Sequence, residues 1–538
     1  MDLATLPWLT ILGVVPLLGA VVLLVLPARK QQLHKVVALT TSLVVLALTV
    51  VMCAVFDPGG DRFQFVQAYD WIPAFGVQYA VGADGIALVL IALIAVLVPV
   101  VLLASWHDAD PVADGAARST AGTTTGEPVP ARTRSVKTFF VLVLVLETMM
   151  IGVFAATDVF LFYVFFEAML IPMYFLIGSY GGPRRSYAAM KFLLFSLAGG
   201  LLMLAAVIGL YVVSADQLEG GGTFAFEQLI GLEMSTAVEI ALFSGFFIAF
   251  AIKAPLFPFH TWLPDAGAEA PVGGAVLLVG VLDKVGTFGF LRYCLPLFPE
   301  ASRILGPYVI ALCVIGILYG ALVAMGQKDL KRLISYTSVA HFGFIGMGIF
   351  AFTTQGQTGA VLYMVNHGLS TGALFLVAGF LIARGRSRLI PDYSGVAALA
   401  PVLAGTFLIA GLSSLALPGL STFVSEFLVL LGTYSRYPVA AVFAVLGVVL
   451  AALYILLTYQ RTMQGEVRLP AGIAKMRDLN LREVVAVAPL LALMVFLGFY
   501  PKPLIDVINP AVEATMQDSG RTDPVPTLGG GDAAAPAR

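Results

Sequence analysis

The sequence predicts an all-α polytopic membrane protein with about fourteen transmembrane helices, including two inverted five-helix repeats that each contain a broken helix. Three observations support this fold class. Of the 538 residues, 59% are hydrophobic and 12% are charged, whereas soluble domains carry about 25% charged residues. The apolar residues form runs of about 20, the length of a helix that spans a bilayer. Prolines interrupt two of these runs at corresponding places.

The predicted spans fill most of the chain from residue 8 to residue 499. The first run is expected to be a span, because Asp2 rather than basic residues precedes it and no small-residue cleavage site follows it. The approximate cores of the spans are 8–26, 36–55, 86–104, 139–156, 159–177, 192–213, 237–258, 272–291, 307–324, 335–352, 359–382, 398–417 continuing brokenly to 433, 439–458 and 484–499.

The charges of the connecting loops predict the orientation. The loops after spans 1, 5, 9, 11 and 13 are rich in Lys and Arg, and those after spans 2 and 6 are acidic. The loop after span 8, with Arg292 and Arg303, is a weak exception. Because basic loops stay in the cytoplasm, both termini are expected outside it. This placement requires an even number of spans.

Two proline-containing breaks predict an internal repeat. One follows Lys253 in span 7, at Ala-Pro255, and the other is Leu417-Pro418-Gly419 in span 12. Because the breaks are five spans apart, the two units would enter the membrane in opposite directions, as in many secondary transporters. The predicted organisation is N-terminal spans 1–3 in 1–104, a flexible cytoplasmic insert in 105–137, five-helix repeats in 138–291 and 305–458, helix 14 and its end in 484–514, and a disordered tail in 515–538.

The sequence predicts no cofactor and no metal bound by this chain. Cys53, Cys294 and Cys313 are isolated and form no Cys-x-x-Cys pair, so an iron–sulfur cluster held by this chain alone is not expected. A Gly-rich phosphate loop after a strand and a spaced set of metal ligands are both missing from the sequence.

Ionisable residues inside the spans are the candidates for function. A charged side chain in the bilayer centre costs at least about 2.5–3.5 kcal/mol, and such residues often form proton relays. Burial favours the neutral form of a lysine and a nearby carboxylate favours the charged form, so a lysine under both influences can release a proton when its partner moves. The candidates are Glu147, Glu167, Lys253, His260, Asp283, Lys284, His341, His367 and Glu426.

Structural explanations stay open for several of these residues. His260 could be a hydrogen-bonding group beside the helix break, and Glu147 could pair with a neighbouring span or subunit. Asp283 and Lys284 could form a local ion pair. Glu167 and Lys253 lie deep in otherwise apolar spans, so they are the strongest candidates for function.

Three long motifs resemble a known family. They are Phe166-Glu167-Ala-Met-Leu-Ile-Pro172-Met-Tyr, Lys253-Ala-Pro-Leu-Phe-Pro-Phe-His260-Thr-Trp-Leu-Pro-Asp265, and Asp329-Leu-Lys-Arg332-Leu-Ile-Ser-Tyr-Thr-Ser-Val-Ala-His341. These segments resemble the antiporter-like subunits of respiratory complex I, the proton-translocating membrane chains of NADH:quinone oxidoreductase. The resemblance is clearest over 135–500.

The resemblance implies a role for each candidate. Glu167 would pair with Lys253, Lys284 would be the central lysine, and His341 and His367 would form the central axis. Glu426 would release protons to the outside; glutamate there is typical of the M-type branch, whereas the L and N types usually carry lysine. The chain also ends soon after span 14, without the lateral helix of the L type. The insert 105–137 departs from the family pattern.

The implied function is proton translocation in the bacterial plasma membrane, driven by quinone reduction in other subunits. The implied partners are the neighbouring L-type and N-type subunits and lipids. Two alternatives remain: a subunit of a multisubunit cation/proton antiporter, which would share most of these motifs, and a purely structural membrane spacer. Copurification of flavin and iron–sulfur subunits would decide against the first alternative. Intact pumping without Lys253 or Glu167 would indicate the second.

Overall fold

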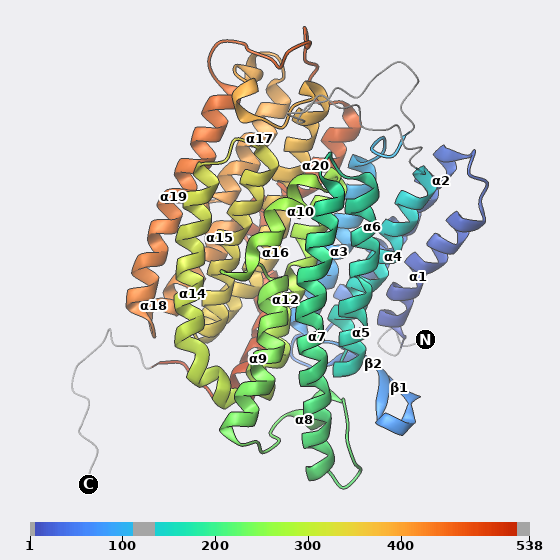
Figure 1. The fold of residues 1–538 in the computed structure, drawn as a ribbon, viewed down its shortest axis with the longest axis vertical. Helices are drawn as coiled ribbons and strands as arrows, with labels where there is room; N and C mark the ends of the chain where they lie inside the picture. Colours follow the sequence, from blue (N-terminus) through green and yellow to red (C-terminus); the bar gives the residue numbers. More distant parts are fainter. Residues whose placement is uncertain (1–5, 111–134, 525–538) are drawn as a thin grey trace.

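The computed structural model describes residues 6–110 and 135–524, which form a helical bundle (Figure 1). Within these residues, thirteen helical stretches are long and apolar enough to cross a membrane. Two shorter apolar helices, α17 (Pro401–Ser414) and α18 (Ser421–Tyr434), occupy the place of the expected twelfth span. The all-α polytopic fold is therefore confirmed. Most of the expected insert 105–137, and residues 525–538 of the expected tail, lie outside the described residues.

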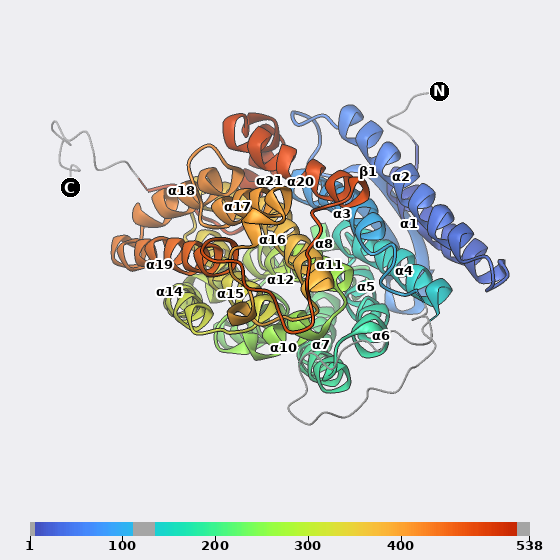
Figure 2. The same cartoon turned by 90° about the horizontal axis from the view of Figure 1, so that it is seen from above.

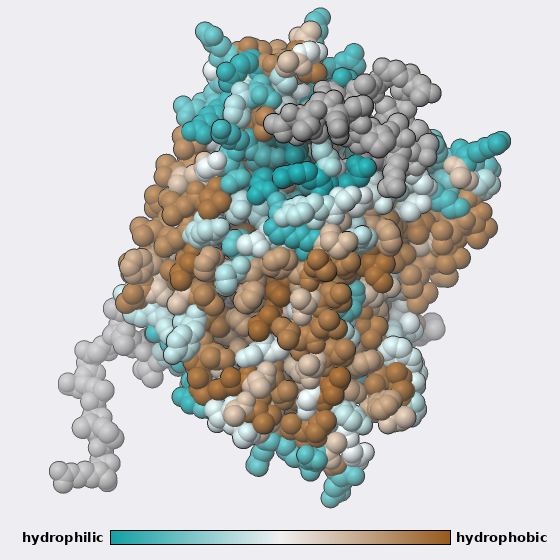
Figure 3. Space-filling model, viewed as in Figure 1, coloured by the Kyte–Doolittle hydropathy of each residue, from teal (hydrophilic) through white to brown (hydrophobic). Residues whose placement is uncertain are grey.

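The surface has the polarity of a membrane protein. Hydrophobic residues dominate the middle of the visible face, and hydrophilic residues collect toward its two ends (Figure 3). Large apolar side chains on the outside of the bundle, such as Leu194, Leu201 and Ile208, are more than half exposed. Lipid tails can cover such side chains, so this belt fits a bilayer.

The N-terminal part contains one element that the sequence analysis did not predict. An antiparallel hairpin, paired from Gln64 with Ala83 to Ile72 with Val77, occupies the acidic connection after span 2. The many aromatic and β-branched residues in Phe65-Val-Gln-Ala-Tyr-Asp-Trp-Ile72 are the local signal for a strand. The elements here are α1 (Trp8–Val25), α2 (Gln31–Val55), β1 (Gln64–Ile72), β2 (Val77–Ala83), α3 (Gly85–Ala104) and α4 (Val136–Ala155).

Both predicted helix breaks are present. Helix α9 (Thr236–Lys253) ends at Lys253, and the chain continues through a 3-10 turn at Phe259–Trp262 into α10 (Leu263–Glu269). Between α17 and α18, Gly419 has a φ of 92° beside Pro418, so the chain turns there. Figure 1 shows α9 below α10 but α17 above α18, so the two broken helices run in opposite directions. Inverted repeats predict this arrangement, although the boundaries of the repeats stay a prediction.

Span 8 is interrupted by two π-helical turns, the second of which directly precedes Leu295-Pro296. Its helical turns are α11 (Val272–Leu277), a π-helical turn at Leu278–Leu282, α12 (Lys284–Gly289), a second π-helical turn at Phe290–Cys294, and α13 (Leu295–Leu297). The apolar part of this span is completely buried. Helices α11 and α12 lie in the middle of the bundle when it is seen from above (Figure 2). Span 8 is therefore a central helix, and π-helical turns are frequent at functional sites.

The remaining helices surround span 8. Helix α21 extends through Asp518, so the expected disordered tail at 515–538 begins too early: its first four residues are helical. The helices are α5 (Val159–Ala168), α6 (Leu170–Tyr180), α7 (Arg185–Gln217), α8 (Phe226–Leu229), α14 (Pro299–Met325), α15 (Leu330–Phe350), α16 (Thr354–Gly385), α19 (Pro438–Met463), α20 (Leu481–Phe499) and α21 (Lys502–Asp518).

Candidate functional site

The predicted site residues lie inside the bundle. Glu167 is half-buried, and the other six are buried, with at most 5% of their surface exposed: Glu147, Lys253, Lys284, His341, His367 and Glu426. Hydrogen bonds, ring contacts and electrostatic interactions connect all of these except Glu147 into one row, in which Asp283 joins Lys253 to Lys284 and Tyr363 joins His341 to Glu426. The row begins at the end of α5 and finishes in α18.

Glu167 lies where span 5 changes from α5 to α6. The chain needs this change because Pro172 has no N–H to donate to the carbonyl of Ala168. The Glu167 carboxylate lies directly against α7 at Gly200, where an added Cβ would lie 1.6 Å from Oε1. Glycine at this position therefore makes room for the carboxylate.

Lys253 is the last residue of α9, where the negative end of the helix dipole favours a cation. Its ammonium lies 4.8 Å from the ring centroid of Phe166 and 5.9 Å from that of Phe192. Lys253 and Glu167 interact electrostatically. Among the salt bridges of the described residues, however, no direct pair within 4 Å joins them. The structure thus brings the predicted partners near each other without a direct ion pair.

Lys284 contacts the next group in the row. Its Nζ lies 2.8 Å from Nδ1 of His367 and also donates to the carbonyl of Val279. A charged lysine is only a donor, so Nδ1 must then accept and the His367 proton must reside on Nε2. Nε2 lies 3.2 Å from Oγ of Ser338, which can accept that hydrogen. The arrangement can move a proton from the lysine to the imidazole.

Aromatic groups continue the row toward α18. The ring centroids of His367 and His341 are 5.3 Å apart, and those of His341 and Tyr363 are 5.8 Å apart. The Tyr363 hydroxyl donates to Oε2 of Glu426 at 3.3 Å. His341 also interacts with the backbone of Ser414, the last residue of α17. The row therefore reaches both halves of the second broken helix.

The sequence analysis did not identify Tyr363 as a site residue. Tyr363 lies four residues before His367 on α16, so the two share a helix face. That spacing is the signal that could have identified it. The sequence analysis also did not identify Ser338. It lies three residues before His341 on α15, so the same kind of spacing could have identified it.

Two other candidates are placed apart from this row. Glu147 is fully buried on α4, and its carboxylate oxygens make no hydrogen bond within the described part of the chain. Helix α4 packs against α5 and α12, which carry Glu167 and Lys284. The ring of His260 stacks on Phe257, with centroids 5.8 Å apart. The role of Glu147 stays a prediction.

Charged residues cover the basic end of the bundle near α10. Asp265 lies 2.7 Å from Nζ of Lys191 and 2.5 Å from Nη1 of Arg332. Glu269 pairs with Arg388 at 3.1 Å. These interactions connect α7, α10 and α15, so they hold the second half of the broken span 7 in place.

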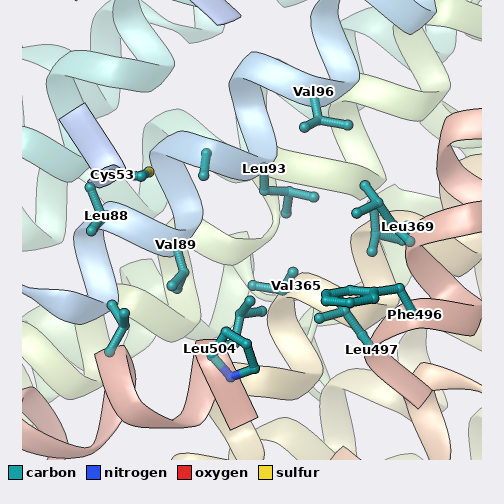
Figure 4. A pocket seen from close by; sticks show the side chains of 14 residues that line it. Cys53, Leu88, Val89, Leu93, Val96, Val365, Leu369, Phe496, Leu497 and Leu504 are labelled. Atoms are coloured by element: carbon teal, nitrogen blue, oxygen red, sulfur yellow. The ribbon is translucent and has the colours of Figure 1, made fainter. Parts of the chain in front are cut away.

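The apolar cavity of about 310 Å³ between α2, α3, α16, α20 and α21 is separate from this row (Figure 4). Its walls are aliphatic and aromatic side chains, together with Cys53. No ionisable residue other than this cysteine lines it, so the cavity does not extend the row of ionisable groups. Within the described ranges, no three His, Cys, Asp or Glu side chains come together as metal ligands.

Comparison with known proteins identifies the class to which this fold and site belong. Residues 156–452 match the family described as NADH:quinone oxidoreductase/Mrp antiporter, transmembrane. The chain is 52% identical over 537 residues to NADH-quinone oxidoreductase subunit M of Mycobacterium tuberculosis H37Rv, covering 97% of this chain and 96% of the relative. It is 38% identical over 528 residues to subunit M of Rhodobacter capsulatus, covering 95% and 96%. The chain therefore belongs to this antiporter-related family and, within it, to the subunit M group.

Solved structures agree with this assignment. A chain of respiratory complex I from Thermus thermophilus with bound NADH superposes with a TM-score of 0.83 at 32% identity, covering 95% of this chain and 100% of that one. A chain of the Mrp complex from Dietzia sp. gives a TM-score of 0.81 at 22% identity, covering 96% and 100%. At that identity the second match shows a shared fold alone.

Proposed function

We propose that this chain is the M-type proton-translocating subunit in the membrane arm of NADH:quinone oxidoreductase. The observation that carries the proposal is the buried row in which Lys284 contacts His367, His367 contacts His341, and Tyr363 connects His341 to Glu426. Each ionisable member can take up and release a proton. The row also lies between two broken helices, which is a common design of membrane transport sites.

The proposed path starts at Lys253 and ends at Glu426. A proton taken up from the basic side reaches Lys253, whose electrostatic partner is Glu167. It passes to Lys284, then to Nδ1 of His367 and on to His341. Glu426 receives it near Tyr363 and releases it toward the opposite side. Moving one charge against 100 mV requires about 2.3 kcal/mol, which quinone reduction in other subunits supplies.

The setting of the subunit follows from the same proposal. Loops rich in Lys and Arg favour the cytoplasm for the basic end, with both termini on the other side. The membrane would be the bacterial plasma membrane, because the relatives named subunit M are bacterial. The neighbouring chains would be antiporter-like subunits of types L and N. NADH oxidation and quinone reduction would take place in other subunits.

A lysine variant tests the proposal. Lys253→Ala leaves the half-buried Glu167 without its cation, and loss of the nearby positive charge favours the protonated form of a carboxylate that is partly removed from water. We expect NADH-driven proton pumping in vesicles to fall severely at unchanged complex content. Lys502→Ala is the control, because Lys502 is exposed and its salt bridge is to Asp506 on the same helix. Normal pumping in an assembled Lys253→Ala complex would contradict the proposal.

The subunit composition tests the alternative function. If the chain belongs to a cation/proton antiporter, the purified complex would lack flavin and iron–sulfur subunits, and ion gradients rather than NADH would drive its transport. If the proposal holds, NADH oxidation drives pumping in the intact complex.

A further inference from the structure

Asp283 is a buried carboxylate between the two lysines of the proposed path. It comes directly before Lys284 in span 8, and no part of its surface is exposed. Neither carboxylate oxygen has a hydrogen-bond partner within the described chain. Buried polar groups are nearly always hydrogen-bonded, so this carboxylate requires a functional or solvent partner. The local ion pair with Lys284, left open as an alternative by the sequence, does not form within 4 Å in the described structure.

We propose that Asp283 is the relay carboxylate that carries protons from Lys253 to Lys284. This inference rests on the proposed function, because it places one more group in the same path. It replaces a direct transfer from the Lys253 ammonium to a neutral Lys284 amine by two transfers through a carboxylate that interacts with both lysines.

The packing of span 8 directs Asp283 toward the end of α9. Gly286 follows Asp283 by three residues, and residues at this spacing share a helix face. A Cβ at Gly286 would lie 2.4 Å from the carbonyl oxygen of Phe250 and 2.6 Å from the backbone nitrogen of Ala254. Span 8 therefore touches α9 beside Lys253 on the face that carries Asp283.

Lys284 faces a different neighbour. Its Nζ contacts His367 on α16, at 2.8 Å from Nδ1. Consecutive residues on a helix are about 100° apart, since a turn contains 3.6 residues. The adjacent residues Asp283 and Lys284 thus connect α9 on one side with α16 on the other. Asp283 interacts electrostatically with both Lys253 and Lys284.

The π-helical turn at Leu278–Leu282 sets this arrangement. The backbone N–H of Asp283 donates to the carbonyl of Leu278, five residues earlier, at 3.1 Å. The wider turn rotates the residues that follow it relative to a regular α-helix. Because π-helical turns often mark functional positions, the irregularity is consistent with a role for the pair that follows it.

The relay consists of two balanced proton transfers. In the first, the Lys253 ammonium gives a proton to the Asp283 carboxylate, which leaves a neutral amine and a neutral acid. In the second, the Asp283 acid gives the proton to a neutral Lys284, which restores the carboxylate and forms an ammonium. Since neither lysine lies within 4 Å of the carboxylate among the described salt bridges, each transfer requires a side-chain movement or a bridging water.

Two substitutions at this position test the relay. Asp283→Asn keeps the shape but cannot exchange a proton, whereas Asp283→Glu keeps the acid. We expect the rate of NADH-driven proton pumping to fall at least about tenfold in Asp283→Asn, since positioned proton transfer contributes rate factors of this size or larger. Asp283→Glu should retain most of the pumping. Thr287→Val, one turn away on the same buried helix, is the packing control and should behave as the unsubstituted protein.

Infrared difference spectra provide a second readout. During turnover, the protonated Asp283 should give a carboxylic C=O band that disappears in Asp283→Asn and shifts in Asp283→Glu. Full pumping by Asp283→Asn would overturn the relay, as would equal loss in the Asn and Glu variants at normal complex content. If Lys253→Ala abolishes pumping while Asp283→Asn does not, only this inference fails. If neither substitution has an effect, the proposed function fails as well.

Discussion

Gly200→Ala should displace the Glu167 carboxylate without unfolding the protein. A Cβ at residue 200 would lie 1.6 Å from Oε1 of Glu167, whereas ordinary van der Waals contact begins at 3.4 Å. The carboxylate must therefore move by about 1.8 Å, which the end of a flexible side chain can do. A displacement of about 1 Å in a positioned group can reduce a rate by roughly 10²-fold. Pumping should fall by one to two orders of magnitude, about 10-fold to 10²-fold.

The Gly200→Ala substitution should not reduce the stability of the complex, although it reduces pumping. Alanine is better than glycine in a helix interior by about 1 kcal/mol, so the thermal midpoint of the complex should not fall. Gly405→Ala in α17 is the matched control, because no atom lies within 4 Å of its added Cβ. Adding Glu167→Asp to Gly200→Ala shortens the acid by one methylene and should be less harmful than the sum of the two single changes. Wild-type pumping by the Gly200→Ala complex, measured in NADH-energised vesicles, would refute the assigned role of Glu167.

Two further predictions concern the end of the row and the support of α17. Glu426→Gln should block proton release because an amide cannot exchange a proton, whereas Glu426→Lys should keep partial pumping; equal loss in both variants would argue against a release role. Asp478 accepts the N–H groups of Val402 and Leu403 at 2.8 and 2.9 Å and so caps α17, and Asp478→Ala should cost about 1 kcal/mol. Burial raises the pKa of Asp478, but hydrogen bonds from Val402, Leu403 and Leu479 outweigh burial and hold the pKa below its usual value. The stabilisation should therefore be complete above about pH 4 and decline as the pH falls through the lowered pKa, and denaturation of the Ala variant should lack this dependence.

The helices and their breaks could be predicted because each has a local cause. Long apolar runs require spans in any surrounding structure. Pro255 and Pro418 remove backbone donors, so the chain must leave the helix near them. The burial of Lys253 and Glu426 could also be expected, since a charge in an apolar run avoids lipid.

The remaining features depend on contacts between distant segments. Gly200 is 33 positions from Glu167, and only the packing of α5 against α7 shows that it makes room for the carboxylate. The π-helical turn at Leu278–Leu282 contains no proline that would indicate it. The spacing of Tyr363 from His367 places the two on one face of α16, but only the structure shows that the Tyr363 hydroxyl contacts Glu426. Contacts between side chains that are distant in the sequence cannot be derived from its hydrophobic periodicity.

The distribution of charge along the row suggests how it refills. Glu167, Lys253, Asp283 and Lys284 supply two acids and two bases, so this group is neutral when all four are ionised. The next members, His367, His341 and Tyr363, can be uncharged. Once Lys284 has passed its proton to His367, the group of four carries a net negative charge inside the bundle, which is costly in a poorly solvated site. This negative charge favours uptake of the next proton. In the proposed path Lys253, at the end of α9, takes up that proton, and the step requires no redox group in this chain.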